Sequence, residues 1–391
     1  MRLLFSTPSF TYAGYPRPGL PIIVGDDMRP LQPVQDFIVW KLLGQGKHLS
    51  LLTWEDYGRR LWDFFSFLGA NGLDWDEPCR EPGKSPLARY RNWSLVELKL
   101  SPKTVNGRLR IVCEFYEWAG RNGLIDGVPF GYLATRRVTH NDLLTHARSD
   151  ASTVSRPDLL IREPSLLPEF LSKEQLRVCR CARANASTML LFDLAARVGL
   201  RSCEARTFPL KYVFNPAARA DCLPSQMIRV RLDPRDMWLK FNKPRDVDIP
   251  YSLMENMYSY TLFERNRLSA NGDARVECLV LNVYGKPYTR SAITEAFKGL
   301  SAQVGFRVRA HMLRHSYAVH TLARLRKEQN FHGEPLLYVR DRLGHSSVDT
   351  TMIYLRQVNQ LASSLVLALE HEFDELFGIA SDQDEEGLRR A

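Results

Sequence analysis

The sequence predicts a mainly α-helical protein with a small β-hairpin, built from an N-terminal helical unit and a C-terminal mixed α/β unit. Apolar residues recur at spacings of three and four along most of the chain, which is the period of amphipathic helices. Residues 227–232 and 245–250 alternate in polarity or are β-branched, and they bracket a polar stretch as the strands of a hairpin do. The chain has 391 residues, more than one hydrophobic core usually organises, so two domains are expected.

The N-terminal unit is expected to be helical after an irregular start. Residues 1–33 are interrupted by prolines and glycines and predict an arm with at most a short strand. Residues 34–70 predict two helices, and the second is expected to begin at Thr53, whose side chain can cap it. Prolines in residues 74–92 indicate a loop.

The next helix is expected to begin at Ser101 and Pro102, with the serine as its cap and the proline in its first turn. An apolar stripe follows along this helix, and Lys103, Arg108 and Arg110 lie off the stripe. Cations in such positions usually belong to a solvated helix face. The alternative is a face laid along DNA phosphates, so these three residues are candidate DNA contacts.

A polar, proline-containing stretch ends this unit. We place a linker at residues 151–167, which bounds a helical unit at 34–150 and a second unit at 168–360. Within the second unit the apolar run 187–200 predicts a buried helix, and Gly199 is well placed to end it.

Composition limits the partners and cofactors that can be expected. The formal net charge of +9, from 53 Lys and Arg against 44 Asp and Glu, suits a polyanion such as DNA, although many other proteins are equally basic. The seven cysteines are scattered without a CxxC pair, which favours reduced thiols over a zinc site, and no cofactor is expected. The N-terminus does not resemble a signal peptide and no apolar run approaches the ~20 residues of a membrane span, so a cytoplasmic bacterial protein with no membrane association is expected.

Four clusters of residues could carry chemistry. They lie after the buried helix, in the hairpin turn, and in two later helical segments, and they contain Arg201; Lys240 and Lys243; His311 and Arg314; and His345 and Tyr354. An arginine and a histidine that face one way on a helix can hold a phosphate. Taken singly, each residue has a simpler structural explanation, such as an ion pair, a helix-terminal charge or a half-buried core tyrosine.

Together the clusters resemble a known family. The segments GLRSCEA, AHMLRHSYAVHTLA and LGHSSVDTTMIYL, in this order and with nine residues from histidine to tyrosine, are similar to those of the tyrosine recombinases, the phage integrase family. The resemblance covers residues 168–360. It implies that these residues form a mixed α/β catalytic domain and that residues 34–150 form the helical DNA core-binding domain of the family.

The resemblance also implies a role for each candidate. Arg201 and Arg314 would hold the oxygens of the scissile phosphate. His311 and His345 would add hydrogen bonds or help to move the tyrosyl proton. Tyr354 would be the nucleophile and would stay bonded to the DNA 3′ phosphate, a bond that conserves the energy of the cut strand, so that rejoining needs neither ATP nor a metal ion.

A lysine would protonate the leaving 5′ oxygen. In the family it lies in a strand turn, often between two glycines, whereas here the turn reads LKFNKPRDVDIP. Counting back from Pro250 favours Lys240 as this general acid, with Lys243 as the second choice and as a candidate DNA contact.

The resemblance finally implies partners and a process. The substrate would be specific recombination sites on double-stranded DNA, bound by a homotetramer, and accessory DNA-bending proteins could assist. The apolar stripe and tail in residues 361–391 would either pack on their own domain or dock on a neighbouring subunit. The reaction would integrate or excise a mobile element, and the alternatives are a type IB topoisomerase-like enzyme and a catalytically silent DNA-binding protein.

Overall fold

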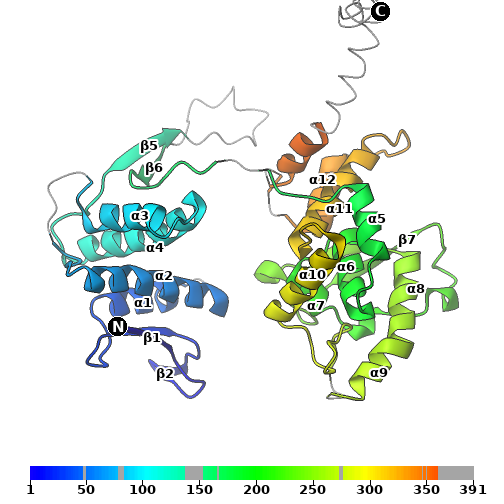
Figure 1. The fold of residues 1–391 in the computed structure, drawn as a ribbon, viewed down its shortest axis with the longest axis horizontal. Helices are drawn as coiled ribbons and strands as arrows, with labels where there is room; N and C mark the ends of the chain where they lie inside the picture. Colours follow the sequence, from blue (N-terminus) through cyan, green and yellow to red (C-terminus); the bar gives the residue numbers. More distant parts are fainter. Residues whose placement is uncertain are drawn as a thin grey trace, which may run out of the picture. The chain divides into compact units, whose positions relative to one another are not determined.

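In the computed structural model the described residues are 1–46, 50–77, 83–136, 153–164, 167–272, 276–345, 347–348 and 350–359. The chain divides into two compact units, Met1–Ser165 and Leu166–Ala391 (Figure 1). Helices dominate both units and every described sheet has two strands, so the prediction of a mainly α-helical protein with a small hairpin is confirmed.

Helices form the body of the first unit, and serines cap three of them. The hydroxyls of Ser50, Ser85 and Ser101 accept hydrogen bonds from backbone amides three residues on. The second helix is therefore capped by Ser50 and not by Thr53, whose amide is the donor to Ser50. A further helix starts inside residues 74–92, where a loop was expected, because a proline fits the first turn of a capped helix. The helices are α1 (Val34–Leu43), α2 (Leu51–Ala70), α3 (Pro86–Val96) and α4 (Pro102–Arg121).

Residues 1–33 form two hairpins instead of the irregular arm that their prolines predict. The antiparallel pairs are β1 (Arg2–Phe5) with β4 (Pro21–Val24), and β2 (Thr11–Tyr12) with β3 (Tyr15–Pro16). The strand prolines stand at strand ends, where a missing N–H interrupts little of the ladder. Leu20, Ile23 and Val24 are buried, with Leu20 and Ile23 in the same core as the helices, so this segment belongs to the first unit.

Another hairpin lies where the end of the helical unit and the linker were expected. β5 (Tyr132–Arg136) pairs antiparallel with β6 (Thr153–Pro157). The chain after β6 is held to α4 by Asn106, whose side chain donates to the Ile161 carbonyl and accepts from the Ile161 amide, both at 2.8 Å. Each strand finds its partner far along the chain, and patterns within a short window do not reveal such pairs.

The second unit is built around α6 (Ala186–Arg197), which is buried over most of its length and packs against α11 (Ala310–Leu325). The predicted hairpin is present, with β7 (Met227–Leu232) antiparallel to β8 (Arg245–Pro250). The other helices are α5 (Lys173–Cys181), α7 (Ser202–Arg206), α8 (Tyr251–Tyr260), a π-helical turn (Thr261–Arg265) with α9 (Asn266–Ser269), α10 (Arg290–Val304), α12 (Pro335–Leu343), a helix at 350–359, and 3-10 turns at Leu210–Tyr212, Pro216–Ala218 and Lys240–Asn242. None of the described helices is both long and apolar enough to cross a bilayer.

Gly199 ends α6 in the left-handed conformation, with a φ of +75°, as predicted for a terminating glycine. A Cβ here would lie 2.5 Å from Cδ1 of Tyr317 and 3.2 Å from Cδ2 of Leu343. The Gly199 carbonyl accepts a hydrogen bond from Arg314. The turn therefore directs the chain into Arg201, the residue that precedes α7.

Replacing Gly199 by alanine is expected to destabilise the second unit by about 2–4 kcal/mol, because left-handed strain adds to a clash with packed side chains. Gly305→Ala is the matched control, since Gly305 has a φ of +78° but open space around its Cβ position. Only the strain, about 1–2 kcal/mol, is expected there. Urea unfolding measures both losses, and equal losses would show that Gly199 is not tightly packed.

Candidate active site

Tyr354 lies on the helix at residues 350–359 and is only 2% exposed. Its hydroxyl stands 2.8 Å from Nδ1 of His315, a residue of α11. Its ring also stacks on that of His345, with 6.1 Å between the centroids and 20° between the planes. The candidate nucleophile thus contacts two imidazoles from different segments of the chain.

The buried guanidinium of Arg314 joins three segments. It donates to the carbonyl oxygens of Gly199 and Leu343 and lies 3.5 Å from Nε2 of His345. Gly199 comes two residues before Arg201. Leu343 likewise comes two residues before His345. One side chain therefore fixes the backbone that carries two other candidate residues.

Glu204 gathers the arginines of the site. Its carboxylate is 0% exposed and accepts from the backbone N–H and from Nη1 of Arg201, at 2.7 and 2.9 Å. Arg245 donates to both carboxylate oxygens, at 2.8 and 2.7 Å, and Arg314 lies 3.8 Å away. Burial would raise the pKa of this carboxyl, but the hydrogen bonds and charge of Arg245, followed by the charges of Arg314 and Arg201, lower the pKa to about 2.

Three guanidinium groups thus surround one carboxylate, which leaves the cluster with excess positive charge. Burial, and then the charge of Arg201, lower the pKa of Arg314 to about 9, so this side chain stays charged at neutral pH. Fixed cations in a water-poor site are suited to an anion whose charge grows during reaction. Across the described ranges no three His, Cys, Asp or Glu side chains come together as a site for a metal ion.

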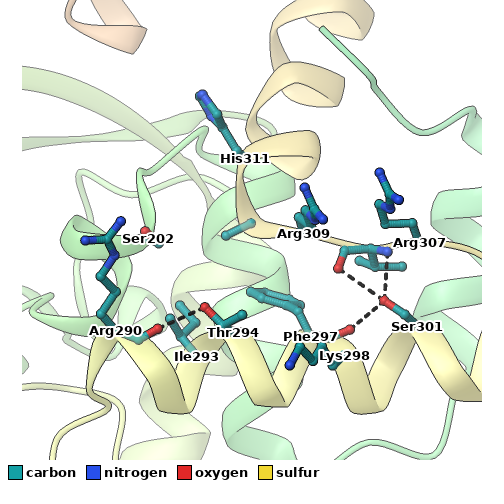
Figure 2. Close-up of a pocket in the computed structure, with 12 residues that line it drawn as sticks. Ser202, Arg290, Ile293, Thr294, Phe297, Lys298, Ser301, Arg307, Arg309 and His311 are labelled. Carbon is teal, nitrogen blue, oxygen red and sulfur yellow. Dashed lines mark hydrogen bonds between the residues drawn. The ribbon is translucent and has the colours of Figure 1, made fainter. Parts of the chain in front are cut away.

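A basic cavity of about 550 Å³ opens beside His311, whose ring centroid lies 4.2 Å from that of His315. Ser202, which follows Arg201 in the chain, also lines the cavity. Figure 2 shows that the arginines of the cavity extend to the same side of α10 as His311. The basic residues of the lining are Arg290, Lys298, Arg307 and Arg309. This cavity therefore extends the positive charge of the site toward solvent.

Both candidate lysines lie in the connection between β7 and β8 and are exposed. Nζ of Lys240 lies 4.9 Å from the ring centroid of Phe241. Lys243 comes two residues before Arg245, which pairs with Glu204. Both lysines are thus close to Arg245 in the sequence. Neither of them contacts the arginine cluster in the described part of the chain.

The three candidate DNA contacts of the first unit lie on α4. Arg108 is partly buried and pairs with Asp63 at 2.6 Å. Arg110 pairs with Glu163 at 2.8 Å. Lys103 is exposed. Two of the three cations are therefore already partnered by carboxylates of the same unit.

Comparisons with known proteins agree with this geometry. Residues 173–360 match the model of the phage integrase family. Tyrosine recombinase XerC of Lacticaseibacillus casei (strain BL23) is 26% identical over 295 residues, which are 69% of this chain and 93% of the relative. XerC of Bacillus pumilus (strain SAFR-032) is 24% identical over 79% of this chain and 87% of the relative. The solved structure of the XerH site-specific recombinase bound to palindromic difH substrate, in a post-cleavage complex, shares the fold with a TM-score of 0.53, at 18% identity over 86% of this chain and 84% of that chain.

This chain is a tyrosine recombinase of the phage integrase family. It belongs to a class of enzymes that cut and rejoin DNA strands, so the predicted family and enzyme class are confirmed.

The two half-buried histidines beside Tyr354, His315 and His345, are neutral at pH 7. Burial, followed by the charges of His311 and Arg314, lowers the pKa of His315 to about 3. Burial and then the charge of Arg314 lower the pKa of His345 to about 3. Burial raises the pKa of Tyr354, and the neighbouring arginines oppose the rise. The tyrosine therefore keeps its proton, and Nδ1 of the neutral His315 is placed to accept a hydrogen bond from it.

His315, Glu204 and Arg245 are site residues that the sequence analysis missed. The run HMLRHS contains His315, but the spacing argument selects only His311 and Arg314. Residues four apart on a helix share a face, so the position of His315 relative to His311 carried a usable signal. Glu204 follows Arg201 by three residues and carried the same kind of signal, whereas nothing near Arg245 in the sequence links it to the others.

The unfolding free energy of the recombinase is expected to fall as pH drops from about 6.5 toward 3. A histidine with a pKa of about 3 in the folded state and ~6.5 in the unfolded state takes up its proton only on unfolding in this interval. Each such histidine lowers the unfolding free energy by up to about 1.4 kcal/mol per pH unit. His315→Gln should therefore give a shallower slope than wild type, whereas His332→Gln, at an exposed histidine, should not. Urea unfolding at several pH values measures the slopes, and a wild-type slope in His315→Gln would mean that this imidazole titrates normally.

Proposed function

We propose that this recombinase cleaves DNA with Tyr354. The observation that carries the proposal is the position of its hydroxyl, 2.8 Å from the neutral His315 and within the field of Arg314 and Arg201. The tyrosyl oxygen bonds to the scissile phosphorus while the bond to the 5′ oxygen breaks, and His315 takes the tyrosyl proton. Phenols ionise near pH ~10, so the phenolate is a fair leaving group when a 5′ hydroxyl attacks to rejoin the strand.

The arginines are proposed to bind the phosphate under attack. Arg201, with a side chain 20% exposed, is reachable from solvent, and Arg314 lies behind it in the same cluster. Their guanidinium groups would hold the non-bridging oxygens, on which charge builds in the pentavalent transition state. His345, held by a 3.0 Å hydrogen bond between Nδ1 and Thr351 Oγ1, would add a further contact through Nε2.

The free protein keeps this site closed. Tyr354 is 2% exposed and Arg314 is 1% exposed, so neither can reach a phosphate that stays in bulk solvent. DNA binding must therefore uncover the tyrosine, and a shift of the helix at 350–359 would do so. His311, which is exposed and lines the basic cavity, is then the histidine first met by the DNA.

The proposed substrate is a specific double-stranded site, as the palindromic difH substrate is for XerH. We propose that residues 34–150 bind the core of this site, that residues 168–360 cut it, and that four protomers act together in the cytoplasm. Residues 361–391, which lie outside the described residues, would dock on a neighbouring subunit. Integration or excision of a mobile element is the proposed role, and accessory DNA-bending proteins would assist.

Tyr354→Phe is expected to abolish covalent capture of a nicked suicide duplex made from the DNA that flanks the gene, because the attacking oxygen is lost. Binding of the same duplex should be unchanged. Tyr338→Phe is the matched control, since this tyrosine donates to Asp248 at 2.7 Å and has no place in the reaction. Denaturing gels reveal the trapped complex, and capture by Tyr354→Phe would identify another nucleophile.

Lys240→Ala is expected to slow cleavage more than Lys243→Ala does, because Lys240 is assigned the protonation of the 5′ oxygen. A substrate with sulfur at the bridging 5′ position should restore cleavage by Lys240→Ala, since a thiol ionises near pH ~8.5 and leaves without a general acid. Single-turnover cleavage rates on both substrates test this. Rescue of Lys243→Ala alone would move the general acid to Lys243.

A further inference from the structure

Phe241 occupies a position that neither packing nor backbone geometry favours. It lies in the connection between β7 and β8, its side chain is 71% exposed, and its φ is +64°. Bulky residues rarely adopt this left-handed conformation, and an exposed ring gains nothing from burial. Glycine would remove the strain, so the ring is retained at a cost in stability, as happens at functional positions.

The surroundings of Phe241 are aromatic and basic. Nζ of Lys240 lies 4.9 Å from its ring centroid, and Lys243 is exposed two residues later. Trp238 is 47% exposed, with Cζ of Arg206 5.6 Å from its ring centroid. The sequence from Trp238 to Lys243 contains no acidic residue. Cations for phosphates beside rings for sugars and bases are the usual means of gripping nucleic acid.

The connection is anchored to the helix that follows Arg201. Before Phe241, the N–H of Trp238 donates to Oγ1 of Thr207, the residue directly after α7, at 3.1 Å. After Phe241, Arg245 pairs with Glu204 inside α7. Four residues of extended chain span at most about 14 Å, so Phe241 stays close to the arginines that are proposed to bind the phosphate.

We propose that Phe241 is a DNA-contacting residue whose ring packs against the sugars and bases of the duplex beside the scissile phosphate. The strained backbone presents the ring outward, where an apolar group can press into a groove while Lys243 binds a flanking phosphate and Lys240 acts on the 5′ oxygen. This inference rests on the proposed binding of DNA by the second unit, and not on which residue cleaves it.

Phe241→Gly tests the inference because it removes the ring and the backbone strain together. The variant should be at least as thermally stable as wild type and should bind a fluorescent mixed-sequence DNA duplex about tenfold more weakly. Phe263→Ala is the matched control, since Phe263 is 74% exposed on the π-helical turn and should not affect DNA affinity. Wild-type affinity in Phe241→Gly would overturn the inference.

The salt dependence of DNA binding shows whether the ring of Phe241 contacts DNA itself or only holds a lysine in position. Loss of one phosphate contact lowers the slope of log affinity against log salt concentration by about 0.9. Lys243→Ala should show this change, whereas Phe241→Gly should keep the wild-type slope. A reduced slope in Phe241→Gly would mean that the ring acts only by placing a lysine, and the inference would fail.

A third comparison keeps this inference distinct from the proposed nucleophile. The loss caused by Phe241→Gly should be the same in a Tyr354→Phe background, because binding does not need the attacking oxygen. If Tyr354→Phe captured DNA covalently while Phe241→Gly bound weakly, the nucleophile would be wrong and the contact would stand. If wild type bound no duplex, both would fail.

Discussion

A single buried carboxylate holds the active site together. Glu204 accepts hydrogen bonds from Arg201 and Arg245 and lies 3.8 Å from Arg314. These arginines come from three places in the sequence, and without a negative charge between them they would repel one another in the protein interior. Leaving such charges buried and unpaired costs about 3–5 kcal/mol. The lowered pKa of Glu204, about 2, reflects how strongly the arginines favour its ionised form.

The same cluster sets the proton chemistry of its neighbours. One carboxylate does not balance three guanidinium groups, and the remaining positive charge helps to keep His315 and His345 neutral. A neutral imidazole beside Tyr354 can accept the proton that a buried phenol does not release by itself. In the proposed reaction a phosphodiester would bring the missing negative charge, and the charge that develops during attack would fall near groups already in place. Structure, anion binding and proton transfer thus depend on one arrangement of charges.

The parts of this arrangement that follow from neighbouring residues could be predicted from the sequence. The end of α6 at Gly199 and the hairpin of β7 and β8 each depend on residues close together in the chain. Pairings between distant segments could not be predicted in this way, which is why the pairing of β1 with β4 and the contact of Arg245 with Glu204 are absent from the sequence analysis. Arg108 shows the same limit: helical spacing gives the direction of its side chain but not Asp63 on another helix as its partner.

The sequence leaves two explanations of Tyr354 open, a core residue or a nucleophile. The position of Tyr354 in the structure is compatible with both. The side chain belongs to a small hydrophobic cluster with Tyr317, Leu343 and Val358, which is distinct from the main core around α6. A small cluster buries little apolar surface, so it opens at a lower free energy than the main core does. The tyrosine can therefore be packed and protonated in the free protein and still be released to DNA without unfolding the domain that holds the arginines.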